Sequence, residues 1–335
     1  MYGAAPMVTT PTATGTKPES IPPFAEHDKL GPLGTKSSVL DSDLELRRAL
    51  IREFQAAADA ARSAAGSADR NTADAVHAYR KALRRARGVL SLVADALPKS
   101  ERRAVRRALQ EARRTLSPAR DHVVAPETLR QLPLADLERE TANLVLATAA
   151  EAAPPLAEIK QLLAEGAARA AAQVEALEAA LPAELSWSTV ARGVRGIYGD
   201  ARRARKAAKR SKRSFHTWRR RSKELTYQLE LLAGFAGSNV GELHHEIEAA
   251  TDPQSAAVDL IMLRDFLRTY GQGVVPEAFE ALVSAVESQL DDLMADARRG
   301  ARDAFRAKPR RFVRRLAKAV RRDLAPAPSD DVVAD

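Results

Sequence analysis

Two stretches of the chain share one pattern: HAYRKALRRARGVLSLV, from His77 to Val93, and HTWRRRSKELTYQLELL, from His216 to Leu232. In each, a histidine is followed by an aromatic residue, an arginine and then leucines at equal spacings. The matched pairs are His77 with His216, Tyr79 with Trp218, Arg80 with Arg219, Lys81 with Arg220, Arg84 with Lys223, Leu90 with Leu229, and Leu92 with Leu231. Because recurrence at a fixed spacing marks a repeated supersecondary unit, we expect two diverged copies of one helical unit.

Helical geometry sorts each copy into two faces. At about 100° per residue, the basic side chains fall on one side and the apolar side chains largely on the other. The expected basic faces are His77, Arg80, Lys81, Arg84 and Arg87 in the first copy, and His216, Arg219, Arg220, Lys223 and Tyr227 in the second. No acid occurs between Asp74 and Asp95, whereas a solvated face normally mixes charges. If the copies pack with pseudo-two-fold symmetry, the basic faces meet across one central cleft.

The composition indicates an all-α protein. Hydrophobic residues make up 45% of the 335 residues and aromatic residues only 4%, and almost every apolar run recurs with the helical period. We therefore expect two tandem, pseudo-symmetric helical bundles, the first over about 42–185 and the second over about 186–323. The absence of cysteine excludes disulfides and thiolate chemistry. No segment reaches the roughly 20 apolar residues of a membrane span, so the expected location is the cytoplasm.

The two ends differ from this helical region. Residues 1–41 are rich in Pro, Gly, Thr and Ser and predict a flexible leader, and residues 324–335 predict a disordered acidic tail. Between them, Asp41 to Asp43 predict one helix start and Asn71 another, whose helix would continue to Pro98. A further long helix is expected over about 276–306, and a last basic helix ends near Asp323.

Basic charge is concentrated from Arg192 to Lys223, where fourteen Arg and Lys residues accompany one acid, Asp200. The like charges of such a stretch repel one another unless solvent or a bound polyanion screens them. The stretch therefore predicts an anion-binding surface. A second basic series runs from Arg298 to Lys318 and contains only one acid, Asp303. These basic residues either extend the cleft or lie on its outer surface.

Taken together, these residues resemble the CHAD family, named for a conserved histidine α-helical domain. The resemblance rests on Val76–Arg87, Leu116–Asp121, Gly193–Arg203, Phe215–Arg220 and Arg302–Pro309, which cover roughly 42–323 in the expected order. It implies a basic cleft that binds inorganic polyphosphate without catalysis. Besides the two basic faces, the residues then expected to contact polyphosphate are Arg120, Arg195, Tyr198, Arg202, Arg203, Lys206 and Lys308.

The second half departs from the family pattern. Val240–His245 resembles the counterpart of the stretch that ends in Asp121, but places His245 where an acid is expected. Glu224 and Thr226 replace the bases that would match Arg85 and Arg87. Fewer ligand contacts are therefore expected from the second repeat.

Catalytic patterns are weak. His244-His245-Glu246 is not a zinc-protease signature, because Ala249 stands where the second histidine ligand is needed. There is no Gly-rich phosphate loop, and the two basic faces offer no carboxylates to hold a catalytic metal. We expect no enzyme activity, no cofactor and no metal.

Three functions remain open from the sequence. The first is binding of inorganic polyphosphate, with association to polyphosphate granules or their regulation, and with other polyanions as further partners. The second is nucleic-acid binding, with Arg192 to Arg213 contacting phosphates, although Trp187, Trp218, Phe215, Phe235 and Phe266 follow core faces and do not suggest base stacking. The third is a scaffold for acidic proteins. His77 and His216 either donate to phosphate or bond to local backbone, and the oligomeric state is not predicted.

Overall fold

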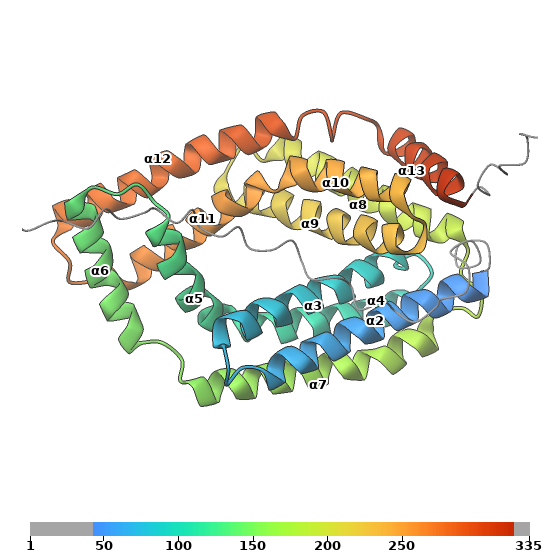
Figure 1. The fold of residues 1–335 in the computed structure, drawn as a ribbon, viewed down its shortest axis with the longest axis horizontal. Helices are drawn as coiled ribbons and strands as arrows, with labels where there is room; N and C mark the ends of the chain where they lie inside the picture. The colour runs from blue at the N-terminus through green and yellow to red at the C-terminus, as the bar shows by residue number, and fades with distance from the viewer. Residues whose placement is uncertain (1–42, 325–335) are drawn as a thin grey trace, which may run out of the picture. The chain divides into compact units, whose positions relative to one another are not determined.

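The structure, a computed structural model, describes residues 43–324, and the expected leader and most of the expected tail lie outside this range. These residues form helices joined by short connections and contain no strand, which confirms the all-α fold class (Figure 1). None of the described helices is long and apolar enough to cross a membrane. The helices are α2 (Asp43–Gly66), α3 (Thr72–Leu92), α4 (Lys99–Arg114), α5 (Ser117–Arg130), α6 (Asp136–Glu151), α7 (Leu156–Ala180), α8 (Trp187–Ala207), α9 (Lys212–Phe235), α10 (Ser238–Thr251), α11 (Pro253–Tyr270), α12 (Pro276–Gly300) and α13 (Pro309–Leu324).

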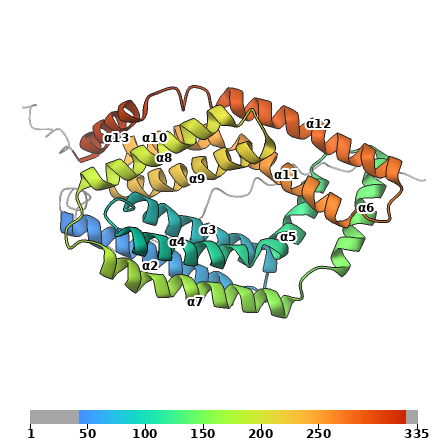
Figure 2. The ribbon, with the colours of Figure 1, turned by 180° about the vertical axis from the view of Figure 1, so that it is seen from behind.

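Two groups of four helices show the same packing pattern. In the first group, α2 packs on α3 and α7, and α4 packs on the same two helices. In the second, α8 packs on α9 and α13, and α10 packs on the same two helices. Both views show each group as neighbouring helices (Figures 1 and 2). The match of α2, α3, α4 and α7 to α8, α9, α10 and α13 supports the expected duplication.

The remaining helices join the two groups. Helix α5 packs on α11, and α6 packs on α12. Helix α3 also contacts α5 as α9 contacts α11, so the same correspondence continues outside the bundles.

The central contact is between α3 and α9, the two helices of the repeated pattern. A Cβ added at Gly88 would lie 3.3 Å from Cβ of Tyr227, so these helices approach closely. Three residues further along α3, the Ser91 hydroxyl accepts a 2.7 Å hydrogen bond from the Gln228 side chain. Tyr79 and Trp218, the matched aromatic residues, are both fully buried, which confirms their predicted core positions.

The last helix, α13, caps the N-terminus of α10. Asp323 of α13 accepts hydrogen bonds from the backbone N–H groups of Asn239, at 2.9 Å, and Val240, at 3.0 Å. Gly237, the residue just before α10, has a φ of 146°, and a Cβ there would lie 3.2 Å from Cγ of Asp323. The α10 N-terminus, which has no side-chain cap from its own segment, is therefore capped from α13.

Two predicted helix ends are wrong. Helix α3 ends at Leu92 instead of continuing to Pro98, and the Ala94 carbonyl beyond it accepts a 2.9 Å hydrogen bond from Arg102. Helix α12 ends at Gly300, and residues 301–306 form turns. The predicted start at Asn71 is confirmed, because its side chain accepts from the backbone N–H of Asp74. Asp41 and Ser42 lie outside the described residues.

Candidate polyanion-binding site

Seven arginine side chains from four helices converge where α3 faces α9. On α3, spacings of four and three residues place Arg80, Arg84 and Arg87 on one side of the helix, while Tyr79 and Leu83 are buried on the other. Each of the seven guanidinium groups interacts electrostatically with at least one other. We call the arginine cluster Arg80, Arg84 and Arg87 of α3, Arg113 of α4, Arg120 of α5, and Arg219 and Arg220 of α9.

Two acids of α5 and α11 hold one side of the arginine cluster in place. The guanidinium of Arg120 lies 2.8 Å from a carboxylate oxygen of Asp259 and 3.3 Å from one of Asp121. On α9, Arg219 donates a 2.9 Å hydrogen bond to the hydroxyl of Ser255. The basic faces of α3 and α9 were expected to carry no carboxylate, but Glu224 of α9 acts electrostatically on Arg87 and Arg220. Helices α5 and α11 bring two more carboxylates, Asp121 and Asp259, to the cluster.

Burial makes the arginine cluster unfavourable for positive charge. Desolvation is the largest cause that lowers the pKa of Arg80, to about 9, and neighbouring guanidinium groups lower it further. The same cause lowers the pKa of Arg219 to about 10, with Arg84 adding to the effect. Both values stay above neutral pH, so the side chains remain charged. The cluster therefore holds repelling cations that a bound anion would stabilise.

Some donors of the arginine cluster are buried without a hydrogen-bond partner. Within the described residues this holds for Nη1 of Arg80, Nε of Arg113 and Nε of Arg219. Leaving a buried donor unpaired costs about 1–3 kcal/mol, and more for a charged group. These N–H groups are therefore suited to donate hydrogen bonds to oxygen atoms of a ligand.

The two matched histidines border the arginine cluster. His77 lies on the second turn of α3 and His216 on the second turn of α9, and both remain exposed. Partial desolvation by the surrounding side chains is the first cause that lowers the pKa of both imidazoles, and a neighbouring arginine is the second, Arg84 for His77 and Arg220 for His216. Both histidines therefore tend to be neutral near pH 7.

Three further predicted residues have roles within the fold. Lys223 pairs with Asp252, with Nζ 3.0 Å from the carboxylate. Tyr227 packs its Cβ toward Gly88 at the helix crossing. Lys81 is partly buried on α3 and adds to the charge around His77.

Tyr198 does not fit its predicted role as a ligand contact. Its side chain is fully buried, and its hydroxyl donates to the carbonyl oxygens of Ala304 and Ala307, at 3.0 and 3.2 Å. The ring stacks on Phe312 with centroids 3.9 Å apart. A side chain enclosed in this way has no surface for a polyanion, so Tyr198 joins α8 to the segment before α13. Arg202 serves the same contact, donating from Nε to the Phe305 carbonyl at 3.1 Å.

The other predicted contacts lie outside the arginine cluster. Arg195, Arg203 and Lys206 are exposed on α8, and Arg203 pairs with Asp200 on the same helix. Lys308 lines a pocket of about 920 Å³ beside α13. We call the α13 surface the exposed basic lining of this pocket: Arg306, Lys308, Arg311, Arg314, Arg315 and Lys318. No residue of the arginine cluster lines this pocket, so the second basic series forms a surface of its own.

The expected counterpart of Asp121 was placed on the wrong helix. His245 lies on α10, whose packing on α9 and α13 matches that of α4. Helix α5 instead matches α11, where Ser255-Ala256-Ala257-Val258-Asp259 parallels Ser117-Pro118-Ala119-Arg120-Asp121. The second half therefore keeps its acid as Asp259, and His245 does not replace it.

Sequence reasoning missed Arg106 and Arg113 of α4. Both interact electrostatically with Arg220, across the two halves. The available signal was the amphipathic pattern of KSERRAVRRALQEARR, in which Val105, Leu109 and Ala112 are buried and the basic residues fill the other side.

Comparisons with known proteins agree with this architecture. The profile of the CHAD domain matches residues 46–268. The crystal structure of the CHAD domain from the plant Ricinus communis is similar, with a TM-score of 0.57 and 19% sequence identity over 79% of this chain and 93% of that one. At this identity the similarity concerns the fold alone. Among curated proteins, none matches the sequence.

Proposed function

The chain belongs to the CHAD-domain family, and on that premise we propose that its arginine cluster binds inorganic polyphosphate without hydrolysing it. The observation that carries the proposal is the convergence of seven guanidinium groups, all but that of Arg220 on buried or partly buried residues, with unpaired buried donors among them. Guanidinium groups recognise phosphate oxygens by paired, charge-assisted hydrogen bonds. A bound polyphosphate would satisfy those donors and offset the repulsion among the arginines.

The carboxylates near the arginine cluster support a binding role without catalysis. Asp121 and Asp259 both lie against Arg120. Metal-assisted phosphoryl chemistry needs carboxylates that hold a cation beside the phosphate. Here the two acids position an arginine, which favours binding of the anion itself.

Nucleic acid is the main alternative ligand. Duplex DNA needs a broad basic face with groups that reach into a groove, and single strands need exposed aromatic rings for stacking. Trp218, Phe215, Phe235 and Phe266 are buried, as predicted, and Trp187 packs against the core. A thin polyanion without bases suits the arginine cluster better.

The test is calorimetric titration of the full chain with long-chain polyphosphate, duplex DNA and single-stranded RNA at two salt concentrations near physiological. Salt must be varied because any basic protein binds polyanions at low ionic strength. We expect polyphosphate to bind at least tenfold more tightly than either nucleic acid at the higher salt, a difference of about 1.4 kcal/mol. Equal or tighter binding of nucleic acid would overturn the proposal.

In the cell, this binding would serve association with polyphosphate granules in the cytoplasm or their regulation. Its support is the same arginine cluster, which would engage the granule polymer directly. A fluorescent fusion should colocalise with granules and lose this localisation when Arg84 and Arg220 are changed to Glu. An unchanged pattern in that variant would separate localisation from the arginine cluster.

A further inference from the structure

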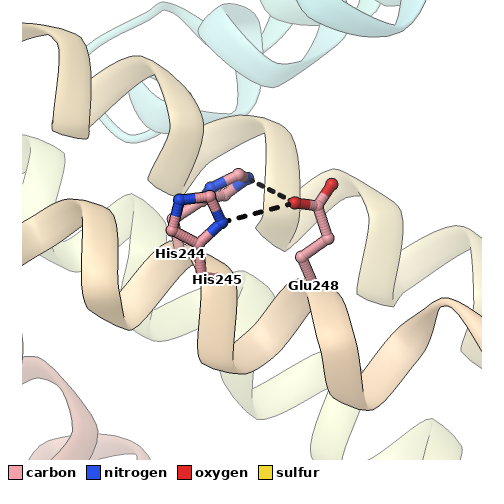
Figure 3. Close-up of side chains that lie close together, drawn as sticks. All are labelled: His244, His245 and Glu248. Atoms are coloured by element: carbon pink, nitrogen blue, oxygen red, sulfur yellow. Dashed lines mark ion pairs between the residues drawn. The ribbon is translucent and has the colours of Figure 1, made fainter. Parts of the chain in front are cut away.

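Helix α10 brings two histidines and a glutamate together, none of which belongs to the arginine cluster (Figure 3). Nε2 of His244 and Nδ1 of His245 each lie 3.8 Å from the same carboxylate oxygen of Glu248. The candidate ligand atoms of the three residues all lie within 4.8 Å of one another. Glu248 is four residues after His244 and three after His245, so one helical turn directs both imidazoles toward its carboxylate.

His244 has no other use for its buried nitrogen. The residue is only 9% exposed, and within the described residues its Nε2 makes no hydrogen bond. The 3.8 Å separation from Glu248 is too long for one. In this arrangement a buried, unpaired imidazole nitrogen points at a carboxylate. Two metal ligands on either side of a cation are arranged in the same way.

The charges around this group suit a cation. From α9, Glu230 adds negative potential at His244 and Lys223 adds positive potential, but the Lys223 ammonium is paired with Asp252. On α10, Glu246 pairs with Arg315 instead of joining the group.

We propose that His244, His245 and Glu248 bind one divalent transition-metal ion, best suited to zinc, with water completing a four-coordinate site. Zinc bonds to imidazole nitrogen and carboxylate oxygen at about 2.0–2.2 Å, which separates ligand atoms by roughly 3.4 Å in a tetrahedral site. The two observed 3.8 Å distances to Glu248 need to shorten by a few tenths of an ångström. The two imidazole nitrogens lie within 4.8 Å of each other and need to approach by at most about 1.4 Å, which side-chain rotation can supply.

The chemistry of the donors separates zinc from harder cations. Mg²⁺ and Ca²⁺ prefer oxygen ligands, whereas two imidazoles with one carboxylate are typical of zinc. The sequence prediction of no metal site rested on the His244-His245-Glu246 motif. The folded helix instead brings in Glu248, four residues after His244 and three after His245.

The experiment is calorimetric titration of the tag-free full chain with Zn²⁺ in buffer without polyphosphate, because polyphosphate itself chelates the ion. We expect one Zn²⁺ per chain. His245→Ala and Glu248→Gln should each weaken binding at least tenfold. His245 is 77% exposed at its side chain, so its replacement leaves the core intact. Glu246→Gln, on the same helix, is the matched control and should bind as the unchanged protein does.

A second readout uses Co²⁺ in place of Zn²⁺, since its visible absorption reports coordination by nitrogen and oxygen ligands. That absorption should appear at one equivalent and be lost in His245→Ala and Glu248→Gln. The proposal is overturned if no ion binds, or if both variants bind as tightly as the unchanged chain. Because polyphosphate is absent from both measurements, either outcome leaves the proposed function untouched.

Discussion

The arginine cluster and the α13 surface are both strongly basic, yet they differ in how their charges are held. The arginine cluster draws on four helices, is partly buried and contains donors without partners. The α13 surface comes from one helix and the turns before it, and its basic side chains are exposed. Two unit charges 4 Å apart interact by about 1 kcal/mol in water but about 4 kcal/mol where the effective dielectric constant is 20. Convergence and burial, more than the number of basic residues, therefore distinguish a binding site from a solvated face.

The largest effect should come from reversing charge in one region and then in the other. The double variant Arg84→Glu with Arg220→Glu should weaken polyphosphate binding at least a hundredfold, or about 2.8 kcal/mol, at near-physiological salt. The matched variant Arg311→Glu with Arg314→Glu makes the same change in net charge on exposed positions of the α13 surface and should change affinity only a few-fold. Titration calorimetry measures both, and circular dichroism checks that helicity is kept. Equal losses would mean that binding follows net charge and that the two regions do not differ.

Tyr198 tests whether the region between α8 and α13 is structural. Tyr198→Phe removes a hydroxyl that donates to two backbone carbonyls, and should lower the free energy of unfolding by about 1–2 kcal/mol. Urea denaturation would show this loss, while polyphosphate affinity should stay the same. A clear loss of polyphosphate affinity with an unchanged free energy of unfolding would show that Tyr198 belongs to the binding site after all.

Replacing Asp323 should also lower the free energy of unfolding, but by less. Asp323→Ala removes the cap of α10 and should cost about 1 kcal/mol of unfolding free energy. Asp323→Asn, which keeps a side-chain oxygen, should recover part of this loss. Polyphosphate binding to the arginine cluster should not respond to either change, and a response would show that α10 and the cluster are coupled.

The smallest expected effect is the change in stability and polyphosphate affinity with pH that His77 and His216 cause. Because their pKa values are lowered in the fold, the unfolded chain binds more protons as pH falls through about 6.5, so the free protein becomes less stable toward acid. Bound polyphosphate reverses the preference by favouring protonated imidazole, so affinity should rise as pH falls from 7.5 to 6. Melting temperature and calorimetry across this range would show opposite trends. The double variant His77→Gln with His216→Gln should flatten both, and trends that survive it would belong to other groups.

The sequence alone predicted the parts of this molecule that depend on local periodicity. The faces of α3 and α9, with Tyr79 and Trp218 in the core, follow from helical spacing. Contacts between distant helices did not follow. The pair formed by Arg120 and Asp259 joins residues 139 positions apart, and nothing in the spacing indicates that α5 meets α11. Tyr198 was misread because an aromatic residue among arginines resembles a ligand contact until its buried surroundings are known.

The cap that Asp323 supplies to α10 has a consequence for the order in which the chain is completed during translation. Val240 and Asn239, whose N–H groups Asp323 caps, are synthesised 83 and 84 positions before it. Until then the first turn of α10 must rely on water for its N–H groups. The cap in the second bundle therefore forms late, after the helices of the first bundle have been available to pack. Nascent chains released before residue 323 would lack the cap.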